Sequence, residues 1–313
     1  SYTLPTGEYD LPLVIQDRTF GENSQLQYVD NGHQMMVGYW ANTLLVNGQL
    51  NYQQKVATSA YRLRLLNGSN ARIYKIAWSD GSPLTVIGTD GGLLDKPTPF
   101  AYVTMSPAER VDLWIDFSQD EVGASRSLQA LPFEGGNSET IDLIPFTVTE
   151  AETNPFTLPT AFAPLTFHEA ANAVNLDSPR IFNFFVNHMT PAIDGRVFEM
   201  GSVTDEETVK LDTLEVWELT NDMNQSGFPH PIHVHGLQFQ VLERLVNEGN
   251  RPQWQSVNEG YVDAGWKDTV LLMPGERVRI LLKFEDYAGT YLYHCHNLEH
   301  EDGGMMRNFQ ITV

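Results

Sequence analysis

The chain has 313 residues, of which 42% are hydrophobic and 19% are charged, a composition sufficient for ordinary buried cores. Its length predicts two domains. The 40 acidic residues outnumber the 19 basic ones and give a net charge of −21, which argues against nucleic-acid binding because phosphates would be repelled. No apolar run reaches the roughly 18 residues of a membrane-spanning helix, so no membrane span is expected.

Short stretches rich in Val, Leu, Thr and Tyr, separated by Gly and Pro, run along the chain and predict β-sandwiches. The chain also contains a diverged internal repeat, in which three segments of the first half recur in the same order in the second half. The pairs are 44–48 with 191–195, 61–67 with 214–221, and 105–111 with 272–278. Each half is therefore expected to be one copy of the same fold.

Three regions follow from this repeat. Residues 1–150 are predicted to form the first domain, residues 151–173, rich in Pro, Thr and Ala, a linker, and residues 174–313 the second domain. Where the second copy carries His230 to His235, the first is expected to carry 76–81, which contains no His.

The second copy holds two dense clusters of metal-ligand residue types. The first reads His230-Pro231-Ile232-His233-Val234-His235. The second reads His294-Cys295-His296, followed by His300 and Met305, and contains the only cysteine of the chain. A lone buried cysteine is usually an inert small side chain, but one between two histidines is typical of copper proteins.

Strand geometry sorts these side chains into two groups. Residues 289–296 are rich in β-formers and predict a strand, on which successive side chains point to opposite faces. One group contains His230, Cys295 and His300, with Met305 in reach. The other contains the histidines at positions 233, 235, 294 and 296.

The chemistry of the two groups differs. Two imidazoles, one thiolate and a weak thioether form a blue-copper electron-transfer site, whereas an all-imidazole group suits further copper, zinc or iron. The backbone between Cys295 and its neighbours would connect the two sites by a short covalent path, which suits electron transfer.

Both clusters resemble the C-terminal copper motifs of the multicopper oxidases, a family that includes laccases, bilirubin oxidases and bacterial cuprous oxidases. The resemblance implies two cupredoxin-like Greek-key sandwiches, an all-β fold equivalent to the family's second and third domains, and the first of them would lack copper. It also implies ligands for three kinds of copper. They are His230, Cys295, His300 and axial Met305 for type 1 copper, His233 for type 2 copper, and His235, His294 and His296 for type 3 copper.

The family's oxygen-reducing trinuclear cluster needs eight histidines, four of them from an N-terminal domain. The remaining histidines here, His33, His168 and His188, are isolated. The resemblance therefore implies an N-terminal cupredoxin domain absent from this chain as a partner. Two-domain laccases match less well, because they carry all four motifs in one chain.

Two carboxylates near the ligands are candidates for supporting roles. By resemblance, Glu301 would relay protons to reduced oxygen, with a solvated or hydrogen-bonding acid as the simpler interpretation. Asp268 is expected to be a structural partner that orients a ligand histidine.

The resemblance implies a copper-dependent, periplasmic or secreted oxidase that passes electrons from a reductant to O2. Dispersed methionines favour small aromatic or phenolic reductants, whereas overall similarity to cuprous oxidases favours metal ions. Some cuprous oxidases carry an acid where this chain has Ser226, although Asp222 is nearby. Two alternatives are a type 1 electron-transfer module and a copper nitrite reductase; His296, directly after the cysteine, argues against the reductase.

Overall fold

The computed structural model describes residues 3–28, 32–221 and 227–313, and Ser226 and Asp222 lie outside the described residues. The chain divides into two compact units. Unit 1 comprises 3–28, 41–165 and 256–265, and unit 2 comprises the described residues of 29–40, 166–255 and 266–313. Two short segments, 32–40 and 256–265, thus belong to a different unit from their described sequence neighbours. In the described ranges, no helix is both long and apolar enough to cross a membrane.

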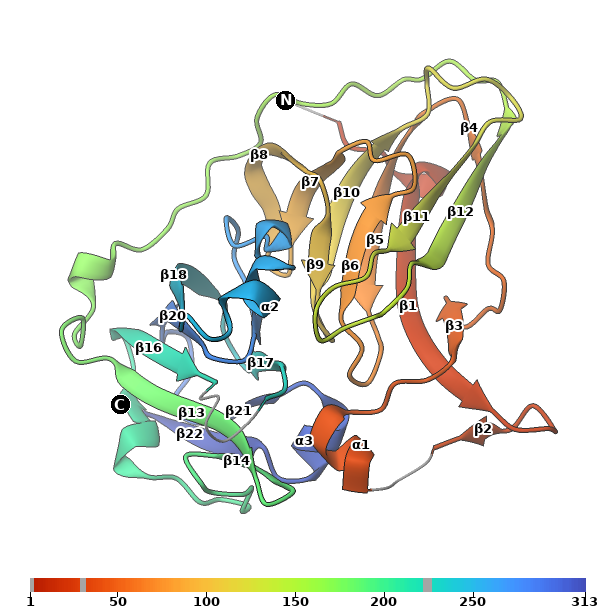
Figure 1. Ribbon diagram of the computed structural model, residues 1–313. Helices are drawn as coiled ribbons and strands as arrows, with labels where there is room; N and C mark the ends of the chain where they lie inside the picture. The colour runs from red at the N-terminus through yellow and green to blue at the C-terminus, as the bar shows by residue number, and fades with distance from the viewer. Residues whose placement is uncertain (1–2, 29–31, 222–226) are drawn as a thin grey trace. The chain divides into compact units, whose positions relative to one another are not determined.

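Unit 1 contains two β-sheets (Figure 1). The first has the order β2-β1-β5-β10-β7-β8, with β3 paired to β1. Its strands are β1 (Asp10–Phe20), β2 (Leu26–Gln27), β3 (Thr43–Val46), β5 (Ala60–Asn67), β7 (Leu84–Thr89), β8 (Gly92–Phe100) and β10 (Arg110–Asp116). The second has the order β4-β12-β11-β6-β9. Its strands are β4 (Gln54–Ala57), β6 (Tyr74–Trp78), β9 (Val103–Met105), β11 (Ser125–Ala130) and β12 (Ile141–Glu150).

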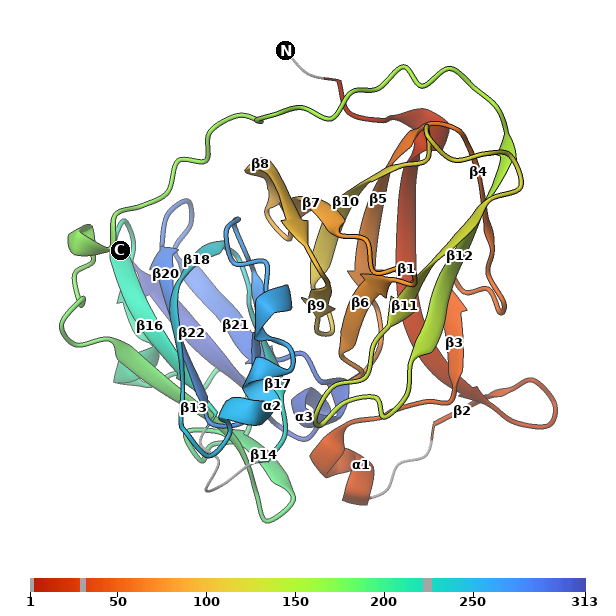
Figure 2. The same ribbon diagram turned by 45° about the horizontal axis from the view of Figure 1, so that its top comes forward.

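Unit 2 also contains two sheets (Figure 2). The first has the order β14-β13-β16-β20-β18. Its strands are β13 (Arg180–Asn187), β14 (Thr190–Ile193), β16 (Leu214–Thr220), β18 (Phe239–Val246) and β20 (Glu276–Lys283). The second has the order β15-β22-β21-β17-β19. Its strands are β15 (Thr208–Lys210), β17 (His230–Val234), β19 (Thr269–Leu272), β21 (Gly289–Cys295) and β22 (Met306–Thr312).

Helices in the described ranges are short. The α-helices are α1 (Gly32–Val37), α2 (Arg251–Gln255) and α3 (Leu298–Asp302), and the 3-10 helices are η1 (Gly7–Tyr9), η2 (Ala170–Asn172), η3 (Asp205–Glu207) and η4 (Asn258–Gly260). The predicted linker has no regular structure from residue 151 to 169 and ends in η2.

Each unit closes around its own apolar core. Alternate residues of the paired strands face inward, as in β1, where Leu13 and Ile15 are buried between more exposed neighbours. The core of unit 2 includes Trp217, Tyr293 and Phe309, whose rings contact one another. The all-β fold predicted from the sequence is therefore confirmed.

The internal repeat is confirmed by matching turns in the two units. Asn47 and Asp194 both have a φ of 51° and follow strands β3 and β14. The Asn47 side chain accepts a hydrogen bond from the backbone N–H of Val14 at 2.8 Å, and Asp194 accepts one from Asn183 at 3.0 Å. The two copies therefore share a turn conformation and the side-chain contact that fixes it.

A second matching turn precedes β10 and β20. The Glu109 carboxylate accepts the backbone N–H of Ser106 at 2.7 Å, and the Glu276 carboxylate accepts that of Met273 at 2.7 Å. Both glutamates are buried. These hydrogen bonds satisfy groups that would otherwise destabilise a buried turn.

Strand register corrects the predicted alignment of the copies by two residues. Tyr74 pairs with Met105, and His230 pairs with Leu272. Met105 and Leu272 hold the same position, directly before the repeated turn. The counterpart of His230 is therefore Tyr74, rather than the first residue of 76–81. Sequence matching missed this because these strands share few residue types.

The same register identifies the counterpart of the cysteine. Ile76 pairs with Ala130 in unit 1, and Ile232 pairs with Cys295 in unit 2. Tyr74 and Ala130 thus stand where unit 2 has a histidine and the cysteine. Unit 1 keeps the sandwich but lacks this ligand pair.

We predict that Ala108→Gly stabilises unit 1 and that Gly275→Ala destabilises unit 2. Both positions have a φ of 70°, in the left-handed region that disfavours a Cβ atom by about 1–2 kcal/mol. A Cβ on Gly275 would also lie 2.5 Å from Asn247 Nδ2. Because glycine gains freedom in the unfolded chain, the gain for Ala108→Gly should be about 0.5–1 kcal/mol. Denaturant unfolding monitored separately in each unit by hydrogen exchange tests both, and a destabilised Ala108→Gly would contradict the assignment of strain.

Candidate copper centres

Two neighbouring strands carry most of the candidate ligands. Strands β17 and β21 are antiparallel, with Ile232 opposite Cys295 and His233 opposite His294. Directly paired residues share a face, and the faces alternate along each strand. Cys295 therefore points to one side of the sheet, and His233 and His294 point to the other.

The first side of the sheet holds a compact group of two imidazoles and a thiol. The Nδ1 atoms of His230 and His300 are 3.1 Å apart, and each lies 3.6 Å from Cys295 Sγ. All three residues are fully buried. Donors about 2.0–2.3 Å from one metal ion and well separated in angle lie roughly 3–4 Å from one another. The group therefore fits a single metal ion, and its donor chemistry is that of type 1 copper.

Burial sets the protonation of this group. The pKa of His230 is lowered well below its usual value by burial and then by His300, and burial lowers the pKa of His300 to about 4. Both imidazoles are thus neutral near pH 7, the form that binds metals. Burial raises the pKa of the Cys295 thiol, which holds its proton until a metal displaces it.

Helix α3 places His300 beside Cys295. Its N-cap, Asn297, accepts the backbone N–H groups of Glu299 at 3.2 Å and His300 at 3.4 Å, which satisfies donors at the helix start. The backbone of Asn297 also hydrogen-bonds to the Cys295 sulfur, a contact that favours the thiolate. One short turn therefore positions a candidate ligand and tunes its neighbour.

Met305 closes the same turn. Its backbone carbonyl accepts the N–H of Cys295 at 3.0 Å, and its N–H donates to the His300 carbonyl at 2.8 Å. Its side chain is fully buried in the same apolar cluster as the cysteine, whereas Met306 is half-buried and pairs with His294. The placement agrees with the predicted axial position, which stays a prediction.

The opposite side of the sheet holds the second group. Ligand atoms of His233, His235 and His294 lie within 4.8 Å of one another, and the Nε2 atoms of His235 and His294 are 3.0 Å apart. The His296 ring is 5.5 Å from that of His294 and 6.1 Å from that of His233. The sheet thus brings the four predicted histidines together, although His296 stands outside the tightest group. Their division between type 2 and type 3 copper stays a prediction.

Hydrogen bonds orient two of these rings. His233 Nδ1 lies 2.8 Å from the Asp268 carbonyl and 3.1 Å from Thr269 Oγ1, so its Nε2 is available to a metal. His294 Nδ1 lies 3.0 Å from the Cys295 carbonyl, which likewise leaves Nε2 available. Asp268 is therefore a structural partner of His233, as expected, mainly through its backbone carbonyl.

Burial also shifts the acid–base behaviour of this group. It lowers the pKa of His294 to about 3 and, with His233, lowers that of His235. Glu301 Oε2 lies 3.4 Å from His294 Nδ1. Burial, and then Asp302, raise the pKa of Glu301, so this half-buried carboxyl holds a proton at higher pH than an ordinary glutamic acid.

The other three histidines do not join either group in the described ranges. His33 and His188 are exposed, and the His168 ring lies 5.7 Å from Trp266. Sequence reasoning also missed two contacts at the candidate copper centres, the Asn297 cap and a hydrogen bond from His300 Nε2 to the Met36 carbonyl at 2.9 Å. An Asn directly before a short helix could have predicted the cap, whereas no sequence pattern indicates the contact with the Met36 carbonyl.

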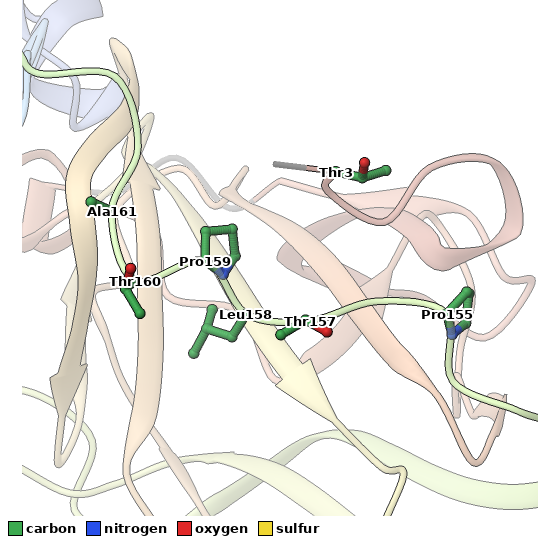
Figure 3. Close-up of a pocket in the computed structure, with 7 residues that line it drawn as sticks. All are labelled: Thr3, Pro155, Thr157, Leu158, Pro159, Thr160 and Ala161. Atoms are coloured by element: carbon green, nitrogen blue, oxygen red, sulfur yellow. The ribbon is translucent and has the colours of Figure 1, made fainter. Parts of the chain in front are cut away.

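A separate cavity in unit 1 offers no comparable chemistry (Figure 3). It has a volume of about 440 Å³ and is lined by Thr3 and by linker residues between Pro155 and Ala161. Its lining consists of threonine, proline, leucine and alanine, which supply neither imidazole nor carboxylate. The two histidine groups of unit 2 remain the candidate functional site.

Two sandwiches and a buried set of two histidines and one cysteine define a copper protein of the cupredoxin type. The family model for multicopper oxidases matches residues 155–313. The chain is 33% identical to a laccase of Bacillus subtilis, over 99% of this chain and 64% of that protein. It is 30% identical to a bilirubin oxidase of Albifimbria verrucaria, over 98% of this chain and 54% of that protein. The chain belongs to the multicopper oxidase family.

Solved structures agree with this assignment. The multicopper oxidase McoA from Aquifex aeolicus superposes with a TM-score of 0.83 at 32% identity, covering 97% of this chain and 66% of McoA. A laccase-like oxidase from Ochrobactrum superposes with a TM-score of 0.81 at 30% identity, covering 97% and 67%. The chain thus spans less than two thirds of the length of three curated relatives, namely 64%, 65% and 53%.

We predict that copper binding at the buried group releases one proton per ion between pH 5 and 8. The low pKa values of His230 and His300 leave both imidazoles unprotonated there, whereas the raised pKa keeps the thiol protonated in the metal-free protein. The apparent affinity for Cu(I) should therefore rise about tenfold per pH unit.

Competition with a Cu(I) chelator at several pH values measures this slope. Cys295→Ser is the control, because it keeps both imidazoles and removes the titrating thiol, and its slope should fall towards zero. A slope near three in the wild type would mean that the imidazoles are protonated before binding, contrary to their burial.

Proposed function

We propose that this chain is part of a laccase-like multicopper oxidase. It would hold the electron-accepting copper site and half of the oxygen-reducing cluster. The observation that carries the proposal is the placement of Cys295 between His294 and His296, with the cysteine on the type 1 side of the sheet and His294 on the other. Two donor groups joined through one peptide bond suit electron transfer between them.

In this proposal, His230, Cys295 and His300 would hold type 1 copper, and Met305 would supply a weak thioether donor. His233 binds type 2 copper, and His235, His294 and His296 bind type 3 copper. Bound copper supplies the one-electron chemistry that the side chains lack. The chain itself fixes the donors, excludes water from the buried group and keeps its imidazoles neutral.

Glu301 is proposed to pass protons to reduced oxygen. Its carboxyl is half-buried beside His294, so it can exchange protons with solvent on one side and serve the histidine group on the other. Its raised pKa favours a protonated carboxyl. Four one-electron donations and four protons convert one O2 into two water molecules.

The histidine group of unit 2 supplies four imidazoles, and we infer that a further domain outside this chain supplies the other four. The support is the family's need for eight and the isolation of His33, His168 and His188 in the sequence. The chain's partial coverage of its relatives is consistent with such a domain.

For the reductant, we propose a small phenolic or aromatic compound, or a metal ion. The relatives named laccase and bilirubin oxidase support the first group, and the Ochrobactrum protein is described as acting on lignin model compounds. Copper content distinguishes an oxidase, whether laccase-like or cuprous, from the alternative of a type 1 electron-transfer module. An oxidase with its N-terminal domain binds four coppers per chain, and a transfer module binds one. A periplasmic or secreted location stays a prediction from the family.

We predict that the 313-residue chain alone takes up copper at the type 1 group but does not reduce O2 to water at a useful rate. Half of the imidazoles of the trinuclear cluster are absent, so three coppers cannot be held in place. Copper loading should produce a thiolate-to-copper absorption band, which Cys295→Ser abolishes. Oxygen uptake should appear only when the N-terminal domain is added.

The measurements are metal analysis, visible absorption and oxygen-electrode traces on the same samples. Rapid oxygen uptake by the chain alone would overturn the domain assignment. A colourless copper-loaded wild type, with equal copper content in Cys295→Ser, would overturn the type 1 assignment.

We predict that Met305→Leu raises the reduction potential of the type 1 copper. An axial thioether stabilises the oxidised ion, and leucine cannot donate. Leucine is close to methionine in volume, so the loss of stability should stay below about 1.5 kcal/mol. A redox titration of the visible band measures the shift. Met306→Leu is the matched control, and a shift with Met306→Leu alone would place the axial ligand one residue later.

A further inference from the structure

A short segment of unit 2, residues 32–40, lies over the buried type 1 group; we name it the cover segment. It consists of α1 and the three residues after it, and Figures 1 and 2 both show α1 beside α3. His300 Nε2 donates a hydrogen bond to the Met36 carbonyl at 2.9 Å, and the N–H of Tyr39 donates one to Glu299 Oε2 at 2.8 Å. The cover segment is thus joined to two consecutive residues of α3.

The contact with Met36 uses the outer edge of the His300 ring. With Nδ1 turned towards His230 and Cys295, Nε2 is the remaining nitrogen, and the Met36 carbonyl occupies its hydrogen-bonding position. A proton on Nε2 also leaves the Nδ1 lone pair for a metal. Because His300 is fully buried, a donor molecule cannot touch its ring while the cover segment is in place.

The other atoms of the type 1 group offer no alternative approach. His230, Cys295 and Met305 are fully buried as well. An aromatic molecule that must contact a ligand ring is therefore excluded in this conformation. A small ion that transfers an electron across a few ångströms does not need that contact.

The cover segment depends on its anchors. A six-residue helix is too short to be stable by itself, so tertiary contacts must hold α1 in position. Glu299 is only 2% exposed, and a buried carboxylate is destabilising unless hydrogen-bonded. Its contact with Tyr39, which is 3% exposed, therefore fixes both partners.

We propose that the cover segment determines donor specificity and that Glu299 is the positioning residue that holds it. When the cover segment is in place, it shields the edge of the His300 ring from phenols and other aromatic donors but allows electron transfer from small ions. Displaced, it exposes that edge to aromatic donors. This inference rests on the proposed type 1 function, but the shielding itself is a property of the metal-free fold.

The first experiment therefore uses copper-free protein. In ¹⁵N-labelled chain, the His300 Nε2–H signal should be visible by NMR, because the proton is buried and bonded to a carbonyl. Glu299→Gln keeps an oxygen for the Tyr39 N–H and should retain the signal. Glu299→Ala removes the anchor and should lose it to solvent exchange.

A second variant tests the cover segment without a substitution at position 299, in case Glu299→Ala fails to fold. Replacing residues 32–37 by a Gly-Ser repeat of equal length leaves Glu299 and His300 intact and should also lose the signal. Glu285→Ala removes one exposed carboxylate elsewhere in unit 2 and is the charge control. A rapidly exchanging His300 proton in the folded wild type would overturn the proposal.

The second experiment follows bleaching of the visible band in copper-loaded chain, without oxygen, by stopped flow. Hexaammineruthenium(II) is the small donor and 2,6-dimethoxyphenol the aromatic one; each loses one electron per copper reduced, and the phenol also releases a proton to buffer. In Glu299→Ala and in the Gly-Ser variant, the rate of copper reduction by the phenol should rise at least tenfold. The rate of reduction by the ruthenium complex should rise less than threefold.

If the variants increase the reduction rates with both donors equally, or with neither donor, the cover segment does not determine donor specificity. Glu299→Gln should resemble the wild type with both donors. The wild type's failure to form a visible band with copper would instead refute the proposed function, and the NMR result would still decide whether the edge is shielded.

Discussion

The candidate copper centres depend on the pairing of β17 with β21, in which Ile232 pairs with Cys295 and His233 pairs with His294. Side chains alternate between the faces of a sheet, so this single register sends the thiol to one side and two imidazoles to the other. A slip of one residue would exchange the faces of every side chain on one strand. Two chemically different groups can therefore occupy neighbouring residues only because the apolar core holds that register.

The core enforces the register through residues beside the ligands. Ile232 and Val234 are buried with Cys295 in the apolar cluster of unit 2, and Tyr293 packs there against Trp217. Alternation places these apolar side chains on the face that also carries the thiol. The favourable burial of these side chains also positions the donor atoms before a metal binds, as a preorganised site requires.

Sequence reasoning identified the parts of this arrangement that follow from local spacing. The strand at 289–296, the separation of Cys295 from its neighbours and the repeat between the two halves all rest on short patterns. It misplaced the copper-free counterpart of His230 by two residues, because Tyr74 and its neighbours resemble β17 in pairing and burial but not in residue type. The Met36 carbonyl beside His300 could not be foreseen, since a backbone acceptor 264 positions away carries no signature in the sequence.

Comparison of the two units separates the fold from the copper chemistry. Unit 1 keeps the same strand pairing and the same turns, yet holds Tyr74 and Ala130 where unit 2 holds His230 and Cys295. The Tyr74 hydroxyl is within 2.9 Å of Ser69 Oγ, so its polar atom is satisfied inside the core. A sandwich of this type is thus complete without ligands. The donors of unit 2 occupy positions that apolar or hydrogen-bonded side chains can fill, and the metal is expected to add function to a fold that apolar burial already stabilises.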